Sequence, residues 1–393
     1  MNHTLECDLV ILGGGIAGLW TLHRAVQSGY NAILFEKSSL GCGQTIHSQG
    51  IIHGGIKYAL NGVLSSASNT IKEMPDIWRK CLAGSGEIDL SGTNLLSDAH
   101  YMWSKQTVGA KLTTFFASKA LRGRVSNLEP EQRPEVFRNP GFKGSLYRLN
   151  ELVLDIPSLI NQLATPLANR IFRAGPEDYR LENIDGKVCF HFDAQQLRLC
   201  PKRIVATCGE GTEAFSQQLQ GIALPEMQRR PLHMVMVKHH SKLPLYAHCF
   251  SGGAKPVITV TTHYTRAGET IWYLGGELAE SGVERDETAQ IEQAKKVLAE
   301  LLPWVSLQNP HWQTVRINRA EPKQSSLTLP DAAFAQEVGN VIVAWPTKLA
   351  LAPDLAGKVL ALMPSPVGGN IPDLEIMPHP VVASPLWEMG NWQ

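Results

Sequence analysis

At residues 8–18 the chain reads DLVILGGGIAG. The four apolar residues 9–12 predict a short buried strand, and a G-x-G-x-x-G pattern follows at Gly13, Gly15 and Gly18. In this pattern the first glycine permits a tight turn, the second lets the backbone approach a pyrophosphate, and the third lets helix and strand pack closely. The stretch therefore predicts a strand that runs into a nucleotide-binding turn.

The next residues complete a strand–turn–helix–strand unit. An amphipathic stretch from Ile16 to about Ser28 predicts a helix, and residues 32–35 predict a second buried strand ending at Glu36. The N-terminus of such a helix offers unpaired N–H groups and a positive dipole end to phosphates. Glu36 follows Gly13 by 23 residues, so its carboxylate is placed to accept hydrogen bonds from ribose hydroxyls. The unit predicts dinucleotide binding, with FAD and NAD both open; the alternative is a tight turn without a ligand.

A second segment bears on the choice of cofactor. Residues 41–58 read GCGQTIHSQGIIHGGIKY, a polar, glycine-rich loop of the kind that lies along an extended ligand. The part HSQGIIHGGIKY, at 47–58, resembles the flavin loop of the FAD-dependent D-amino-acid-oxidase-like superfamily, and most closely its glycerol-3-phosphate and 2-hydroxyglutarate dehydrogenases. The resemblance implies that the cofactor is FAD, bound without a covalent link.

Two later segments are similar to further FAD contacts of that superfamily. Residues 202–211 predict a buried strand that runs into a glycine turn, and residues 340–360 predict a strand, a turn and an apolar helix. At the second turn the family often has glycines, whereas this chain has Trp345 and Pro346. The cofactor-binding residues that the resemblance and the glycine motif imply are Gly13, Gly15, Ile16, Ala17, Gly18, Glu36, Lys37, Thr45, Ser48, Gln49, Gly50, Ile51, Ile52, Thr207, Cys208, Gly209, Thr347, Lys348 and Leu349.

The length of 393 residues predicts two or three domains at roughly 150 residues each. The fold class expected is α/β with α+β: a Rossmann-type FAD-binding domain, and a substrate domain with a mostly antiparallel sheet and flanking helices. Strand-like runs near 232–237, 257–262 and 270–274 and a helix over 286–302 support the second domain. The expected ranges are 1–84, 150–222 and 315–365 for the FAD-binding domain, 85–149 and 223–314 for the substrate domain, and 366–393 for a proline-rich tail.

Composition excludes several classes of protein. The 36 Lys and Arg residues balance 36 Asp and Glu residues, so no basic field is available to hold nucleic acid. Hydrophobic residues make up 44% of the chain, which argues against disorder. No transmembrane or export segment is predicted, which favours a cytoplasmic protein. The apolar residues of the tail suggest that it docks on the body of the protein or on a protein partner.

Cysteines and histidines give no metal pattern. The seven cysteines are scattered, odd in number and without a C-x-x-C pair, so reduced thiols are expected. The histidines in or beside predicted strands have no carboxylate at metal-ligand spacing, so structural or pocket roles are expected and no metal is predicted. These histidines are His233, His239, His240, His248 and His263.

The resemblance also implies an active site, in which a hydride passes from a substrate C–H bond to flavin N5. Such a site needs an anchor for the substrate's acid group, positive charge near the flavin pyrimidine and, for some substrates, a base. Arg319 is the expected anchor, with Arg316 as its competitor, and Lys348 the expected cation near the flavin. Lys57 replaces an arginine of the family, and His53 is a candidate for proton transfer. The alternatives are a surface salt bridge for Arg319, a solvated loop position for Lys348, a helix cap for Lys57 and backbone hydrogen bonding for His53.

The sequence thus predicts an FAD-dependent oxidoreductase that acts on a small anionic substrate and is reoxidised by oxygen or another acceptor. A 2-hydroxy acid, a polyol phosphate or an amino acid fits this description, and the lysines favour the first two. One alternative is amine oxidation of the glycine- or sarcosine-oxidase type. Another is an FAD-binding subunit with little turnover of its own.

Overall fold

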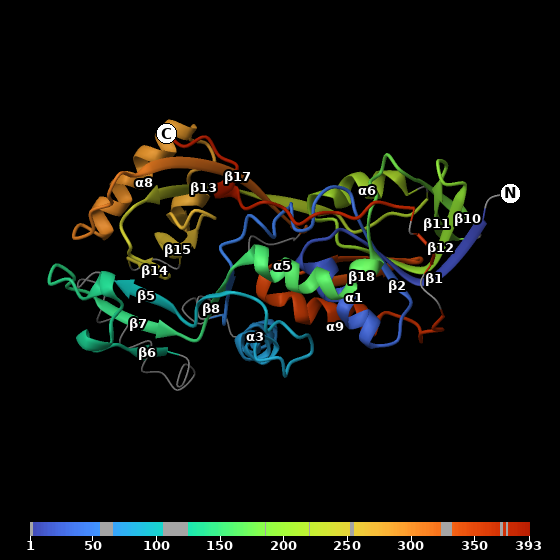
Figure 1. Ribbon diagram of the computed structural model, residues 1–393, viewed down its shortest axis with the longest axis horizontal. Helices are drawn as coiled ribbons and strands as arrows, with labels where there is room; N and C mark the ends of the chain where they lie inside the picture. The colour runs from blue at the N-terminus through green and yellow to red at the C-terminus, as the bar shows by residue number, and fades with distance from the viewer. Residues whose placement is uncertain are drawn as a thin grey trace.

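The computed structural model describes residues 3–55, 66–104, 125–184, 186–219, 221–251, 255–323, 332–369, 372–374 and 376–393. The molecule is elongated, with one large sheet in each half (Figure 1). A small sheet between them has the strand order β3 (Ile51–Ile52), β8 (Leu152–Leu154), β4 (Leu95–Ser97). It carries part of the predicted flavin loop, because β3 lies within the segment 47–58.

The first large sheet has the order β10-β11-β12-β1-β2-β9, with β19 beside β12 and β18 beside β19. Its centre is parallel and completely buried, as expected for strands covered on both faces: Leu9, Val10 and Ile11 of β1 have no exposed surface. The strands are β1 (His3–Leu12), β2 (Ala32–Glu36), β9 (Ile171–Arg173), β10 (Arg180–Ile184), β11 (Lys187–Phe192), β12 (Leu197–Ala206), β18 (Phe334–Val338) and β19 (Val341–Trp345).

Helices cover both faces of this sheet. One face packs against α1 (Ile16–Gln27), α3 (Ser66–Leu82), α5 (Ile156–Ala164) and α9 (Ala352–Ala361), whose apolar residues share one core with the strands. The other face carries an aromatic core, with α6 (Thr212–Gln218) packed on it. Each buried leucine or isoleucine contributes about 1.5–3 kcal/mol, so this double packing fixes the strand ends where the nucleotide turn begins.

The second large sheet has the order β17-β13-β16-β15-β14-β5-β7-β6 and is antiparallel except where β14 meets β5. The helix predicted over 286–302 is confirmed as α8 (Glu287–Leu301), capped by the Asp286 side chain, and it follows the short helix α7 (Glu277–Glu280). The expected fold class is confirmed. The strands are β5 (His100–Ser104), β6 (Val125–Asn127), β7 (Ser145–Leu149), β13 (Met227–His239), β14 (Ala247–Phe250), β15 (Ile258–Tyr264), β16 (Thr270–Gly275) and β17 (His311–Pro322).

Strand β17 crosses a predicted domain boundary. It pairs with β13 along its whole length, from His311 to Pro322, and the two long strands lie side by side in Figure 1. The boundary expected at residue 315 therefore falls inside a strand of the second sheet. Short 3-10 turns complete the described elements, at Pro130–Gln132, Glu135–Phe137, Thr165–Arg170, Gly209–Gly211, Leu349–Leu351 and Leu386–Glu388.

The C-terminal tail docks on the body of the protein, along both halves. Its backbone pairs with Leu40 near the first sheet, where Val382 forms a parallel bridge, and Gln393 pairs with Trp312 of β17. Trp387 is buried in the second sheet's core. Figure 1 shows this red segment running from one half to the other. The tail thus holds the two halves together through its own contacts.

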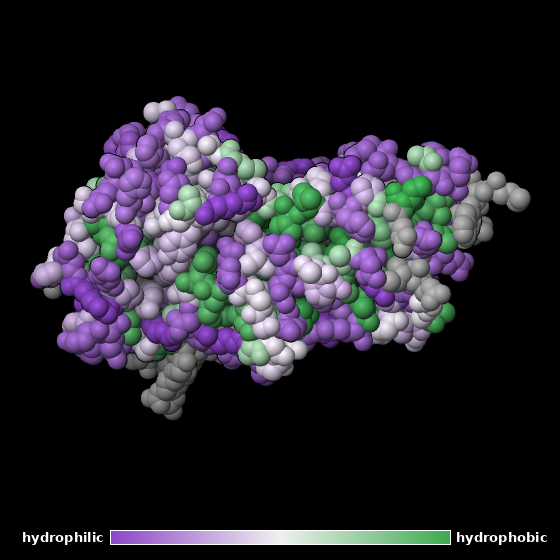
Figure 2. All heavy atoms as spheres, in the orientation of Figure 1, coloured by the Kyte–Doolittle hydropathy of each residue, from purple (hydrophilic) through white to green (hydrophobic). Residues whose placement is uncertain are grey.

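Hydrophilic residues cover most of the face shown in Figure 2, and the hydrophobic ones gather in patches along the middle of the molecule. Across the described ranges, none of the helices combines the length and the apolar character needed to cross a membrane.

One cysteine prediction is wrong. Cys189 and Cys200 form a disulfide between β11 and β12, whereas Cys7, Cys42, Cys81 and Cys208 are free thiols. The strand register explains the pair: Phe190 lies opposite Leu199, so the next residues outward, Cys189 and Cys200, face each other with their Cα atoms 4.5 Å apart. Spacing along the sequence did not reveal this pairing, because the hairpin creates it.

Candidate active site

The glycine turn after β1 is shaped by backbone that leaves no room for side chains. Gly13 has φ +104°, and a Cβ atom there would lie 2.6 Å from the Thr207 carbonyl oxygen. A Cβ atom on Gly18 would overlap the carbonyl oxygen of Gly13 itself. The motif therefore meets its geometric requirement: β1, β12 and α1 approach one another as closely as a dinucleotide-binding turn demands.

Polar groups surround the start of α1. The Ile16 N–H donates to the Thr45 hydroxyl at 3.1 Å, and the Gly14 N–H donates to the Glu36 carboxylate at 2.7 Å. No acidic residue lies in the first turn of α1 itself, which leaves the positive end of its dipole available to a phosphate. The Thr45 hydroxyl, which accepts from the helix end, keeps its own hydrogen for a ligand oxygen.

A cavity of about 850 Å³ runs along this turn and on to the second sheet, a volume typical of cofactor and substrate pockets. Most predicted cofactor residues line it: Gly13, Gly15, Ile16, Ala17, Glu36, Lys37, Thr45, Ser48, Gln49, Ile51, Thr207, Cys208, Gly209, Thr347, Lys348 and Leu349. Gly18, Gly50 and Ile52 are not among the lining residues, and Lys57 lies outside the described residues. The glycine turn, the helix N-terminus and the cavity together fit FAD.

The turn after β19 departs from the family pattern in sequence, and one of its residues adopts a conformation that glycine favours. Thr347 has φ +60°, the left-handed region that glycine favours, and its hydroxyl donates to the Ala332 carbonyl at 3.2 Å. Trp345 is buried beneath this turn, and Lys348 lines the cavity beside it. A strained threonine at this position, costing about 1–3 kcal/mol, is the kind of feature found at functional sites.

The predicted flavin loop is tied to the second sheet. The Gln49 side-chain amide donates to the Tyr273 carbonyl at 2.8 Å, and the Tyr273 hydroxyl donates to the His47 carbonyl at 3.0 Å. Burial raises the pKa of Tyr273, so this hydroxyl stays protonated. The two contacts fix the loop at the level where the cavity reaches the second sheet.

Three charged side chains stand where the cavity meets β17 and α7. Lys255 forms an ion pair with Glu280 at 2.5 Å, and the other carboxylate oxygen of Glu280 lies 3.9 Å from the Arg319 guanidinium. All three line the cavity. The competitor Arg316 also lines it, but its guanidinium donates to the Val283 and Arg285 carbonyls. Arg319 donates through Nε to the Arg230 carbonyl at 3.5 Å, and its Nη2 is the atom that lies 3.9 Å from Glu280. Both arginines therefore stay candidates for the anion anchor, and Arg319 is the one beside Glu280.

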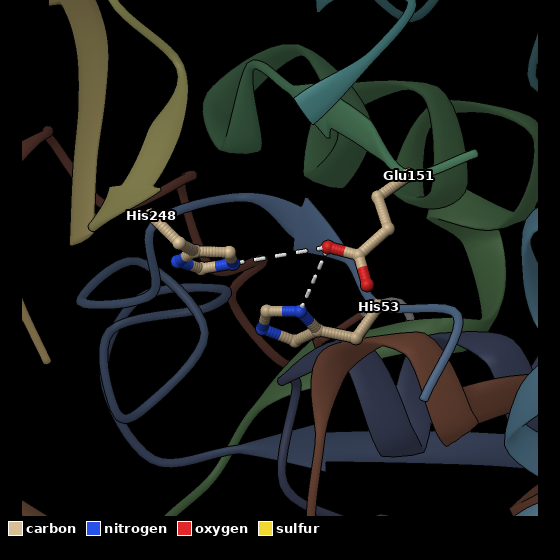
Figure 3. A group of neighbouring side chains, drawn as sticks. All are labelled: His53, Glu151 and His248. Atoms are coloured by element: carbon tan, nitrogen blue, oxygen red, sulfur yellow. Dashed lines mark hydrogen bonds and ion pairs between the residues drawn. The ribbon is translucent and has the colours of Figure 1, made fainter. Parts of the chain in front are cut away.

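A carboxylate lies between two histidines on the same cavity. Glu151 lies 3.3 Å from His53 Nδ1 and 3.9 Å from His248 Nε2 through one oxygen, and accepts from the Gly54 N–H at 3.0 Å through the other (Figure 3). His53 comes directly after β3, Glu151 from just before β8, and His248 from β14. His53 and Glu151 line the cavity.

Glu151 is ionised despite its burial. Its side chain is 2% exposed. Burial alone would raise the pKa of Glu151, but the charges of His53 and His248 and their hydrogen bonds hold that pKa well below its ordinary value. His248 is oriented in turn by the Thr259 hydroxyl, 2.7 Å from its Nδ1. The arrangement is a buried anion that fixes the His53 ring.

Sequence reasoning missed part of this site. Along the sequence no carboxylate stands at metal-ligand spacing from His248, and the fold brings in Glu151 from 97 residues earlier. Lys255 and Glu280 were not singled out either, since a Lys–Glu pair 25 residues apart has no local signature. Glu277 also lines the cavity, whereas Trp272 is buried in the core of the second sheet.

The glycine turn at residues 13–18, the second large sheet and the cavity that reaches from one to the other define a flavoenzyme. The chain belongs to the DAO family of FAD-dependent oxidoreductases, whose family model matches residues 8–334. The resemblance seen in the flavin loop is thereby confirmed, and the cofactor of the chain is FAD.

Relatives agree with this assignment. A probable FAD-dependent oxidoreductase of Pseudomonas aeruginosa is 50% identical over 99% of this chain and 100% of its own length. The crystal structure of a P. aeruginosa FAD-dependent oxidoreductase superposes with a TM-score of 0.83, at 43% identity over 99% of each chain. L-alpha-glycerophosphate oxidase from Mycoplasma pneumoniae with FAD bound shares the fold alone, with a TM-score of 0.63 and 12% identity over 93% of this chain and 97% of its own. One subunit of the anaerobic glycerol-3-phosphate dehydrogenase of Haemophilus influenzae is 34% identical over 18% of this chain and 12% of its own length.

Proposed function

We propose that this FAD-dependent oxidoreductase oxidises a small anion that carries a hydroxyl group, either a 2-hydroxy acid or a polyol phosphate. When bound, FAD accepts a hydride from the substrate carbon. Oxidation of an alcohol also releases the hydroxyl proton, so the protein must supply a base, whereas an amine can be oxidised as its neutral form. The substrate's C–H hydride goes to FAD, its O–H proton goes to the base, and the product carries a carbonyl group.

The observation that carries the proposal is the His53–Glu151 pair. A neutral His53 ring whose Nδ1 donates to the Glu151 carboxylate, 3.3 Å away, would carry its lone pair on Nε2. As that nitrogen takes the hydroxyl proton, the neighbouring carboxylate stabilises the imidazolium that forms. Arg319 and Lys348 line the same cavity and supply positive charge for the acid group of the substrate and for the reduced cofactor.

The test is anaerobic reduction of the purified, FAD-loaded protein by candidate substrates. Reduction is measured as loss of the visible flavin bands. We expect 2-hydroxy acids or polyol phosphates to bleach the flavin rapidly, and glycine and sarcosine not to. Replacement of Arg319 by Met should raise the substrate concentration that gives half-maximal bleaching. Bleaching by none of these compounds would instead support the FAD-binding subunit.

One observation favours amine oxidation as a second candidate. The Glu280 carboxylate lies 3.9 Å from Arg319, so the pair could hold the ammonium and carboxylate groups of an amino acid together. In that case glycine or sarcosine bleaches the flavin, and Glu280→Gln abolishes the bleaching. The same titration therefore separates the two candidates.

A further inference from the structure

Charge around the cavity is nearly balanced. Among the described lining residues, five are lysine or arginine and six are glutamate. Glu151 is compensated by its two histidines, and Glu321 lies 3.5 Å from Arg230 in an ion pair. With these two glutamates compensated, five cations face four glutamates, and so small a surplus of positive charge suits a singly charged carboxylate better than a doubly charged phosphate.

Glu280 is the carboxylate that an incoming acid group would meet. An anion bound to the Arg319 guanidinium would lie beside the Glu280 oxygen that is 3.9 Å from the same guanidinium. Lys255 holds the other oxygen at 2.5 Å and so offsets part of this negative charge. Lys255, Glu280 and Arg319 together carry a net charge of one positive unit, which matches one negative charge on the substrate.

We propose that Glu280, held by Lys255, makes the site select substrates with a monoanionic acid group and disfavours phosphate dianions. This inference rests on the proposed function and narrows its substrate to a 2-hydroxy monocarboxylate, which would be oxidised to the 2-keto acid. Arg319 binds the carboxylate, and Lys255 acts as a positioning residue that keeps Glu280 from closing onto Arg319.

The experiment compares the wild-type holoenzyme with Glu280→Gln. For each, kcat/KM is measured for a series of 2-hydroxy monocarboxylates and for glycerol 3-phosphate at pH 8, where the phosphate is doubly charged. The wild-type protein should prefer a monocarboxylate, and Glu280→Gln should shift the ratio toward the phosphate by about 10-fold, chiefly through KM. Exposure and salt limit the shift, because the Glu280 side chain is 29% exposed.

Matched variants sharpen the comparison. Glu284→Gln removes the same charge from an exposed position that does not line the cavity, and should leave the ratio unchanged. Lys255→Met should lower kcat/KM for both substrates, and more so for the phosphate. Adding Glu280→Gln should reverse that loss. The inference is overturned if Glu280→Gln has the wild-type ratio, or if the wild-type protein prefers glycerol 3-phosphate to every monocarboxylate tested.

Binding of inert anions separates this inference from the proposed function. Acetate and inorganic phosphate are titrated into the holoenzyme, with the shift of the flavin bands as readout. If no hydroxy compound is oxidised but Glu280→Gln still improves phosphate binding relative to acetate, the proposed function fails and the charge selection stands. If hydroxy compounds are oxidised and the variant leaves the relative binding of both anions unchanged, the selection by Glu280 fails alone.

Discussion

The cradle and the substrate side of the cavity are built in opposite ways. The cradle, residues 9–18 with Thr207, depends on backbone that approaches backbone where side chains are missing. The substrate side, comprising His53, Glu151, His248, Lys255, Glu280 and Arg319, depends on charged side chains that converge from distant segments. A change of shape should therefore damage the first region, and a change of charge should damage the second.

The largest effect is expected from adding one methyl group to the cradle. In Gly18→Ala the new Cβ atom would overlap the Gly13 carbonyl, which is backbone and cannot move without opening the turn between β1 and α1. We expect the purified variant to have lost its FAD, measured as the ratio of flavin absorbance to protein absorbance, while circular dichroism reports whether the chain still folds.

Gly357→Ala is the matched control. Gly357 lies on α9, which packs against α1, and a Cβ atom there would meet nothing within 4 Å. This variant should keep its FAD and gain up to about 1 kcal/mol of stability, since alanine is the better helix former. Full FAD content in Gly18→Ala would show that shape does not govern the cradle.

The next largest effect is expected from removing one charge on the substrate side. Glu151→Gln keeps the size of the side chain and an acceptor for the Gly54 N–H, but removes the anion beside His53. We expect anaerobic flavin reduction to slow by about 10²–10⁴-fold with FAD still bound, because His53 loses the charge that stabilises its protonated form. Rapid-mixing absorbance at several pH values would measure both the rate and its pH dependence.

Glu182→Gln is the control for this charge. Glu182 lies on β10 and pairs with Arg198, away from the cavity lining, so its loss should change neither rate nor pH profile. If Glu151→Gln reduced its flavin as fast as the wild-type protein, the His53–Glu151 pair would have a structural role only. Charge would then not govern the substrate side of the cavity.

The same contrast explains which parts of the site could be predicted from the sequence. The glycine turn of the cradle was predictable because the strand, turn and helix follow one another within residues 8–36, so the order of residues alone implies their geometry. Thr207 could be suggested only through the family resemblance. Arg319 and His53 could be suggested only through the family resemblance. Glu151 and Glu280 could not be found, because each is paired with a group that only the fold brings near. The disulfide between Cys189 and Cys200 was missed for the same reason, since it depends on the register of β11 and β12.

A third effect concerns the tail that contacts both halves of the molecule. Trp387 is 4% exposed and stacks on His263 of β15, with ring centroids 4.5 Å apart. Trp387→Ala should lower the free energy of unfolding by about 3 kcal/mol, because it leaves a cavity in the second sheet's core. Met389→Ala is the control, since Met389 is 64% exposed and its loss should cost little. An unchanged unfolding midpoint in urea for Trp387→Ala would mean that the tail does not stabilise the second sheet.

The smallest expected effect is a pH-dependent loss of stability that differs between the two large sheets. Burial lowers the pKa of His263 to about 3, and that of His239 to about 4, from an ordinary value of 6.5. Their contribution to the free energy of unfolding is complete above pH 6.5 and is lost as the pH falls toward the pKa values of the folded state. The reason is that the unfolded chain binds protons at these histidines at a pH where the folded sheet does not. Between pH 6.5 and 5, one such histidine should account for about 2 kcal/mol.

Both of these histidines lie in the second sheet, on β15 and β13. Hydrogen exchange at pH 5 should therefore show the amides of the second sheet losing protection before those of the first. His263→Phe, which keeps an aromatic ring against Trp387, should reduce this pH dependence, whereas His311→Gln, at an exposed position, should not. If both sheets lost protection together at every pH, the two halves would unfold as one cooperative unit. The difference between cradle and substrate side would then be one of chemistry alone and not of stability.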